Sequence, residues 1–335
     1  MTGPGHQARE WHDARVPGKL IERRTDLGGI PVFYRESPEA SDRPVMVHVP
    51  GFGLSGRYLV PTAERLAEEF HTYVPDLPGF GRSGRPSPAL GIDELADALA
   101  AFLDDRGVDK TTLVGNSMGC PVSCAFAYRH PDRLDRVVLV SPAGGVHNQP
   151  LPKAMSQISR DGLREPVRLL PEVVPDYLRF GVRSTVDLFR TLTSFPTLER
   201  ILAVRVPALV VVGQRDPLMP GPTRLAEIAA QIENRVLMVV IDEAAHAINY
   251  THPDELANVI RLFMADRPIV DDPNAPGRAT TYEIHRGIRS QIERRSPRPI
   301  ATDVGGVARS SRLRPQSAPD ASGSRCRRAG VPSRQ

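Results

Sequence analysis

Residues 111–129 read TTLVGNSMGCPVSCAFAYR, and this stretch decides the fold class. The first part, TTLVGN, is a short apolar run typical of a buried strand, and the remainder has the length and composition of a helix. Gly115 and Gly119 flank Ser117, so the chain can turn sharply there and hold the serine exposed. The pattern predicts a strand, a tight turn and a helix, with Ser117 as a nucleophile. A glycine-rich turn with an incidental serine is the alternative.

The rest of the chain alternates short apolar runs with amphipathic segments. Residues 19–36 are typical of two strands joined by a turn at Gly28 and Gly29. Further strands are expected over 45–51, 71–79, 136–142, 208–217 and 235–242, and helices over 55–70, 87–108, 224–233 and 252–265. Strands that alternate with helices of ten or more residues indicate an α/β fold with a mostly parallel sheet and helices on both faces.

Two segments interrupt this alternation. Residues 144–203 contain short amphipathic pieces, several prolines (Pro171, Pro175 and Pro196 among them) and no convincing strand, which predicts a small helical insertion. Residues 268–335 are rich in Pro, Arg, Ser and Gly, with weak helical potential only in TTYEIHRGIRSQIER, and are predicted to be a basic, disordered tail. The expected organisation is therefore a flexible leader (1–18), a core (19–143 and 204–267), the insertion and the tail.

The charge of the protein is concentrated in the predicted tail. The net charge is +4, but residues 268–335 carry 13 Arg and 6 acidic residues, so the rest of the chain is at −3. This distribution argues against a nucleic-acid-binding body, and a solvated extension is the simpler interpretation. No apolar run of 18 residues and no secretory signal are present, so we expect no membrane span and a cytoplasmic location.

Two further polar residues complete a candidate catalytic set. Asp216 follows the strand-like run ALVVVGQR, and His246 follows the run RVLMVVID. The carboxyl ends of parallel strands meet at one edge of a sheet, which brings both residues toward Ser117. We predict His246 as the general base and Asp216 as the acid that orients it, in the chain order serine, acid, histidine. Asp242 is the rival acid, and a turn-forming aspartate or a surface histidine would explain either residue alone.

Several motifs together resemble the α/β-hydrolase fold superfamily. They are VPGFG (49–53), DLPGFGRS (76–83), GNSMG (115–119), GQRDP (213–217) and EAAHAINYTHPDEL (243–256). The resemblance spans about residues 20–266 and implies an eight-stranded, mostly parallel sheet with 144–203 as a helical lid that contributes to substrate binding. It also implies an oxyanion hole formed by the backbone N–H groups of Phe52 and Met118. Pro50 departs from the family, which often has a histidine there.

The nucleophile narrows the expected reaction. Relatives that act as haloalkane dehalogenases or epoxide hydrolases use Asp where this chain has Ser117, so acyl chemistry on a small, largely apolar carboxylic ester is expected. The elbow is also similar to that of hydrolases that cleave C–C bonds in ring-fission dienoates, but Cys120 and Ala247 depart from their pattern. For those enzymes, Arg160, Arg183 and Arg190 are candidate carboxylate ligands. A cofactor-free haloperoxidase and a non-catalytic ligand-binding protein remain alternatives.

Three further expectations concern ligands and buried residues. No metal or organic cofactor is implied, and the oligomeric state stays open. Cys120 and Cys124, four residues apart in the predicted helix, are expected to pack in the core. His48 is expected to be a hydrogen-bonded core histidine. Residues 76–83 are expected to shape a turn beside the site.

Overall fold

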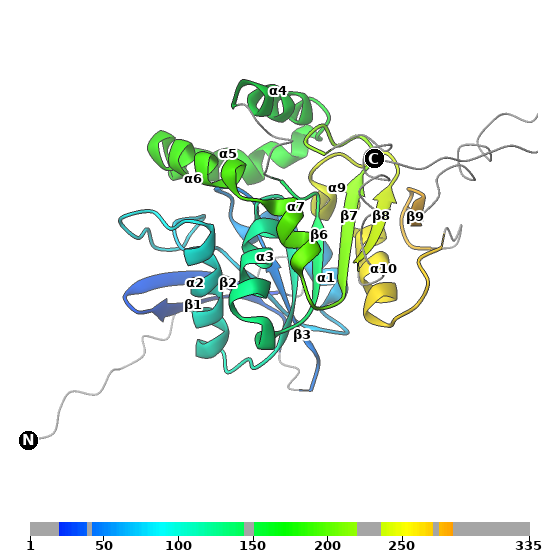
Figure 1. Ribbon diagram of the computed structural model, residues 1–335, viewed down its shortest axis with the longest axis horizontal. Coiled ribbons are helices and arrows are strands. Elements are labelled where there is room, and N and C mark those ends of the chain that lie inside the picture. The colour runs from blue at the N-terminus through cyan, green and yellow to red at the C-terminus, as the bar shows by residue number, and fades with distance from the viewer. Residues whose placement is uncertain (1–19, 39–41, 144–150, 220–235, 271–274, 284–335) are drawn as a thin grey trace, which may run out of the picture. The chain divides into compact units, whose positions relative to one another are not determined.

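A nine-stranded sheet forms the centre of the computed structural model, which describes residues 20–38, 42–143, 151–219, 236–270 and 275–283 (Figure 1). The strand order is β1-β2-β4-β3-β5-β6-β7-β8-β9. The strands are β1 (Ile21–Leu27), β2 (Ile30–Glu36), β3 (Val45–Val49), β4 (His71–Pro75), β5 (Thr111–Asn116), β6 (Leu134–Val140), β7 (Ala208–Gly213), β8 (Val236–Ile241) and β9 (Thr281–Glu283). The six strands from β4 to β8 in this order pair in parallel, and the outer strands pair antiparallel.

The predicted mostly parallel sheet is confirmed, but the strand count of eight is corrected to nine. The additional strand, β9, lies within the segment that was predicted to be a disordered tail. Its backbone pairs with the exposed edge of β8, with Thr281 opposite Ile241. Three residues suffice because the sheet edge supplies the hydrogen-bonding partners, and so short a segment carries no periodicity that a sequence can reveal.

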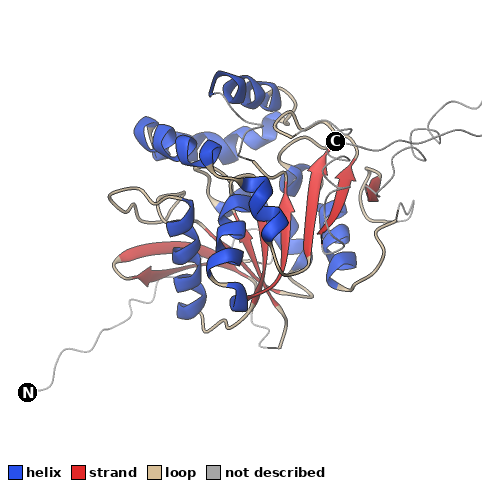
Figure 2. Cartoon of the chain, viewed as in Figure 1, coloured by secondary structure: helices blue, strands red, loops and turns tan. Residues whose placement is uncertain are grey.

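Helices cover both faces of the sheet, as Figure 2 shows. They are α1 (Val60–Leu66), α2 (Ile92–Asp105), α3 (Gly119–Arg129), α9 (Ile248–Thr251) and α10 (Pro253–Met264), with short 3₁₀ turns η1 (Gly56–Leu59) and η2 (Pro131–Arg133). Adjacent residues of β5 point to opposite faces: Leu113 packs in the core with α2 and α3, and Val114 packs in the core with α10. This two-sided burial explains why the central strands are almost entirely apolar.

The segment between β6 and β7 is helical in its described part, residues 151–203, which we refer to as the lid segment. Its elements are α4 (Leu151–Gly162), η4 (Val167–Leu169), α5 (Leu170–Phe180), α6 (Val182–Ser194) and α7 (Thr197–Ala203). Helices α4, α5 and α6 lie at the end of the sheet toward which β7 and β8 point (Figures 1 and 2). The segment is therefore placed beside the carboxyl ends of the parallel strands, where sites gather in this kind of sheet.

Other predicted segments fall outside the described residues. They are the leader, the helix expected over 224–233 and most of the tail. Within the residues that the structure describes, no helix is both long and apolar enough to span a membrane.

Candidate active site

Ser117 lies at a sharp turn between β5 and α3, in a backbone conformation that few non-glycine residues adopt (φ 54°). The two flanking glycines are required by close backbone contacts. A Cβ on Gly115 would lie 2.5 Å from the carbonyl oxygen of Gly119, and one on Gly119 would lie 2.2 Å from that of Val49. The Ser117 N–H donates to the carbonyl of Val140 at 2.9 Å. Neighbouring strands thus hold the serine in a strained position, as nucleophiles at such turns are held.

His246 and Asp216 are joined by a hydrogen bond. The Nδ1–H of His246 donates to Asp216 Oδ2 at 2.8 Å, and the second carboxylate oxygen accepts from the Leu218 N–H at 2.8 Å. The Asp216 side chain is fully buried, and these two hydrogen bonds compensate for the loss of water around its carboxylate. The partner of His246 is Asp216 and not the rival Asp242. With Nδ1 donating, Nε2 is the nitrogen that remains to accept a proton.

The two predicted oxyanion-hole residues have unengaged backbone donors. Among the described residues, the N–H groups of Phe52 and Met118 donate no hydrogen bond within the protein. Met118 precedes the first turn of α3, where backbone N–H groups have no partner inside the helix. The loop that carries Phe52 reaches Ser117, because a Cβ on Gly51 would lie 3.2 Å from Ser117 Cβ. Both donors are available to a developing negative charge.

Tyr58 connects this loop to the turn of the nucleophile. Its buried hydroxyl accepts from the Gly51 N–H at 2.8 Å and donates to Asn116 Oδ1 at 2.7 Å. Asn116 Nδ2 donates in turn to the Val140 carbonyl at 3.1 Å. Sequence reasoning missed Tyr58, and its position in a predicted helix carries no signal for this role. These hydrogen bonds fix the position of the loop that carries Gly51 and Phe52, here termed the oxyanion loop, relative to Ser117.

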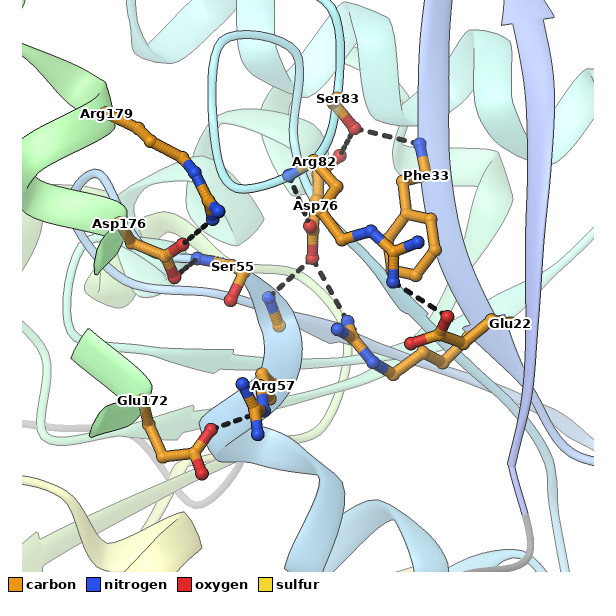
Figure 3. A network of polar contacts seen from close by, with 12 residues as sticks. Glu22, Phe33, Ser55, Arg57, Asp76, Arg82, Ser83, Glu172, Asp176 and Arg179 are labelled. Carbon is orange, nitrogen blue, oxygen red and sulfur yellow. Dashed lines mark hydrogen bonds and ion pairs between the residues drawn. The ribbon is translucent and has the colours of Figure 1, made fainter. Parts of the chain in front are cut away.

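Asp76 organises the loop that follows β4, as Figure 3 shows. Its fully buried carboxylate accepts from Arg35 at 3.2 Å, from the Gly56 N–H at 2.8 Å and from the Arg82 N–H at 2.9 Å. Burial raises the pKa of Asp76, and Arg35 acts in the opposite direction. Ser83 donates to the Asp76 carbonyl and accepts from the Phe33 N–H. The motif at 76–83 therefore shapes a turn, in agreement with the expectation from the sequence.

The lid segment contacts the oxyanion loop through α5 (Figure 3). Asp176 Oδ2 accepts from the Ser55 N–H at 2.8 Å, and Glu172 forms an ion pair with Arg57 at 2.6 Å. The ring of Phe180 packs edge-on against Phe52, with ring centroids 5.8 Å apart. Phe80 and Phe189 extend this aromatic cluster, Phe80 against Phe180 and Phe189 against Phe52. An apolar wall thus stands beside the predicted oxyanion donor.

Two carboxyl groups of the lid segment hold the loop of His246. Asp161 Oδ1 accepts from the His246 N–H at 3.3 Å, and Glu165 Oε1 accepts from the Ala247 N–H at 2.7 Å. Desolvation raises the pKa of Asp161 to about 6 and that of Glu165 to about 7. Burial lowers the pKa of His246, but Asp216, Asp161 and Glu165 together outweigh it and raise this pKa to about 9. Neither lid residue was identified from the sequence.

The buried His48 differs from its expectation. It lies in the core as predicted, but neither ring nitrogen has a hydrogen-bond partner among the described residues. Its desolvation lowers the pKa to about 3, so the ring is neutral. The prediction of a hydrogen-bonded histidine was therefore wrong.

The cysteines and potential metal ligands give a simpler result. Cys120 and Cys124 are buried free thiols on α3, as expected for packing residues. Burial raises the pKa of the Cys120 thiol well above its usual value. Across the described residues, no three His, Cys, Asp or Glu side chains come together as a metal site.

Comparisons with known proteins agree with this geometry. A family model of the alpha/beta hydrolase fold matches residues 44–176. A putative carbamate hydrolase of Rhizobium rhizogenes is 27% identical over 240 residues, which cover 65% of this chain and 91% of the relative. Among solved structures, a bacterial membrane phospholipase A has a TM-score of 0.63 at 22% identity, covering 74% of this chain and 86% of that one. A serine hydrolase of carbazole degradation has a TM-score of 0.58 at 23% identity, covering 74% and 100%.

Proposed function

We propose that this chain, which is similar to proteins of the alpha/beta hydrolase fold, is a serine hydrolase acting on a small, largely apolar carboxylic ester. Two observations carry this proposal: Ser117 has a strained, positive-φ backbone, and His246 donates from Nδ1 to Asp216. A serine hydroxyl needs a base to accept its proton, and a histidine oriented by a buried carboxylate is the usual base.

The reaction follows from these roles. His246 Nε2 accepts the hydroxyl proton as Ser117 Oγ attacks the carbonyl carbon, and Asp216 stabilises the imidazolium that forms. The oxyanion of the tetrahedral intermediate accepts from the N–H groups of Phe52 and Met118. The imidazolium returns its proton to the leaving alcohol, which leaves an acyl-enzyme. A water molecule activated by His246 then hydrolyses the acyl-enzyme and releases the acid.

The charges near the site favour a neutral substrate. Asp161, Glu165 and Asp216 surround the loop of His246, so a substrate carboxylate would meet like charge there. Arg160 and Arg190, two of the arginines considered as carboxylate ligands, are exposed, and the side chain of Arg183 lies outside the described residues. These observations support an ester over a ring-fission dienoate. A carbamate presents the same kind of carbonyl, and the relative from Rhizobium rhizogenes supports testing one.

The apolar wall beside the oxyanion loop supports an apolar acyl or aryl group. Phe180 and Phe189 each contact Phe52 there, and such surfaces usually bind the uncharged part of a ligand. We expect medium-chain nitrophenyl esters to be cleaved with a higher kcat/KM than charged, water-soluble esters. The opposite ranking would contradict this choice of substrate.

A fluorophosphonate probe tests the mechanism directly. We expect covalent labelling of the folded protein at Ser117, identified by mass spectrometry of the peptide, and no labelling of the Ser117→Ala variant. Cys120, which is buried and free, remains unlabelled and serves as an internal control. A folded protein that is not labelled at Ser117 would overturn the proposal. If Ser117 is labelled, a panel of nitrophenyl esters, a nitrophenyl carbamate and a dienoate assigns the substrate class.

A further inference from the structure

Exposed apolar side chains are concentrated on the lid segment. Of the ten large hydrophobic residues that are exposed in the described part of the chain, eight lie between residues 158 and 186. They are Ile158, Leu163, Val167, Leu170, Val174, Tyr177, Leu178 and Val186. Leu163 is 87% exposed and Leu178 80%, values close to those of an unfolded chain. Exposed apolar residues that are scattered singly are normal, but a group of them on one surface often marks an interaction site.

The spacing places most of these side chains on one side of η4 and α5. The positions 167, 170, 174 and 178 follow one another at three or four residues, and 177 is three residues from 174, which is the period of a helix face. The opposite side of α5 is occupied by Asp176 and Phe180, which are buried against the core. Helix α5 therefore buries Asp176 and Phe180 on one side and has, on the other, an apolar side without a partner among the described residues.

Charged residues of the lid segment are sorted by sign. Between residues 151 and 190, the exposed cations are Lys153, Arg160, Arg164, Arg168, Arg179 and Arg190. The carboxyl groups of Asp161, Glu165, Glu172 and Asp176 instead face the rest of the protein, where they hold backbone N–H groups or Arg57. Among the described residues of this span, only Asp187 is an exposed acid. Arg164, Arg168 and Arg179 contact Arg215, Tyr250 and Asp176. The other three cations, Lys153, Arg160 and Arg190, make the outer surface of the lid segment cationic as well as apolar.

We propose that the outer surface of the lid segment docks on a lipid bilayer that contains anionic headgroups. A helix that combines exposed apolar residues with Lys and Arg, and few acids, lies in the interface of such a bilayer. The apolar side chains enter the acyl boundary, and the cations pair with phosphates. A second copy of this chain is a poorer occupant, because two such surfaces would bring like charges opposite each other. The docked surface belongs to the same segment that contacts the candidate site through Asp176 and Phe180.

Vesicle co-sedimentation of the full-length protein tests this proposal. We expect binding to vesicles of phosphatidylcholine with phosphatidylglycerol, weaker binding to pure phosphatidylcholine, and a decrease with added salt. Leu163→Gln and Leu178→Gln should each weaken binding about tenfold, because each removes a leucine from the bilayer boundary. Lys153→Gln with Arg160→Gln should weaken it about fivefold for each cation.

Val270→Gln is the matched control, because Val270 is 62% exposed and lies outside the lid segment, so its loss should leave binding unchanged. Glutamine is a good helix former, and thermal melting checks that each variant stays folded. Absence of vesicle binding by the wild-type protein would overturn the proposal. Equal binding by the double leucine variant would do the same and would assign association to another part of the chain, such as the arginine-rich residues after 283.

Self-association is measured in the same experiment. Leu163→Gln and Leu178→Gln could dissociate a dimer without an effect on vesicle binding. This result would assign the surface to a second copy and refute docking on lipid. Binding requires no turnover. Vesicle binding and hydrolase activity are therefore measured separately, and the failure of one leaves the other unaffected.

Discussion

Asp161→Asn and Glu165→Gln should move the pH dependence of catalysis by removing charge beside the proposed general base. Each substitution keeps an amide oxygen where the carboxylate oxygen now accepts from the N–H of His246 or Ala247. The backbone contacts of the lid segment are therefore preserved, and the negative charge alone is lost. Because these carboxylates raise the pKa of His246, their removal should lower it.

The size of this effect follows from the geometry. The two carboxyl groups accept hydrogen bonds from the backbone N–H groups of His246 and Ala247, so both lie close to the imidazole ring of His246. A unit charge about 6 Å away contributes roughly 3 kcal/mol at an effective dielectric constant of about 20, equal to about 2 pKa units. Solvent screening and partial protonation of Glu165 reduce this contribution, so we expect about one unit for each substitution.

The acid limb of kcat/KM reports the pKa of the base in the free enzyme. General base catalysis needs a neutral His246, so activity rises with pH through its pKa, and a lower pKa shifts the limb to lower pH. We expect shifts of about one pH unit for each variant with a neutral nitrophenyl ester, and up to about two for the double variant. Asp187→Asn removes an exposed acid of the same segment and should leave the profile in place.

An unchanged acid limb in the double variant would refute this reasoning. It would mean that the carboxylates are not near His246 in the working enzyme, so the lid segment would have a different position during turnover. A loss of kcat without a shift would instead assign the two residues a role only in holding the loop. The pH profile separates these outcomes because a purely structural defect does not change which proton limits the rate.

Three other substitutions test separate contacts. Ser117→Gly should abolish turnover yet raise the free energy of unfolding by about 1 kcal/mol in urea denaturation, because glycine relieves the positive φ; a destabilised variant would contradict the strain. Tyr58→Phe leaves the Gly51 N–H and Asn116 without their buried partner, so we expect a loss of about 2 kcal/mol in stability and a lower kcat; an unchanged kcat would disconnect this residue from catalysis. Asp76→Ala should cost about 3–5 kcal/mol by thermal or urea unfolding, because it strands the buried Arg35, and a cost below that would show that solvent reaches the arginine.

The buried strands were predictable from the sequence because their environment leaves one kind of residue. All of β7 (Ala208–Gly213) is buried, so it reads as an uninterrupted apolar run. The turn of Ser117 was predictable for a related reason, since backbone contacts at Gly115 and Gly119 exclude any side chain. Within the helix predicted over 55–70, α1 begins at Val60 with Pro61 in its first turn, the part of a helix that accommodates proline. Local constraints of this kind can be recognised in the sequence because they restrict the residue type at each position.

The contacts that complete the candidate site depend on residues far apart in sequence. Glu165 binds the N–H of Ala247, 82 residues away, and nothing in the local sequence distinguishes it from a solvated lid residue. Tyr58 contacts Asn116 across 58 residues, from a segment predicted only as a helix. The unpartnered ring of His48 could not be foreseen either, because the sequence shows that a residue is buried and not what surrounds it. These features arise from packing, which pattern alone does not determine.

The contact between Asp176 and the Ser55 N–H gives the lid segment a second consequence. Moving α5 outward would break this bond and the contact of Phe180 with Phe52, so the loop that carries the proposed oxyanion donor would lose its support. A substrate large enough to keep α5 displaced would then be bound while the donor is poorly placed. As the acyl group grows, the substrate would still bind but kcat would fall. The longest substrate that is turned over would then depend on how far α5 can move before the loop of Phe52 changes its position.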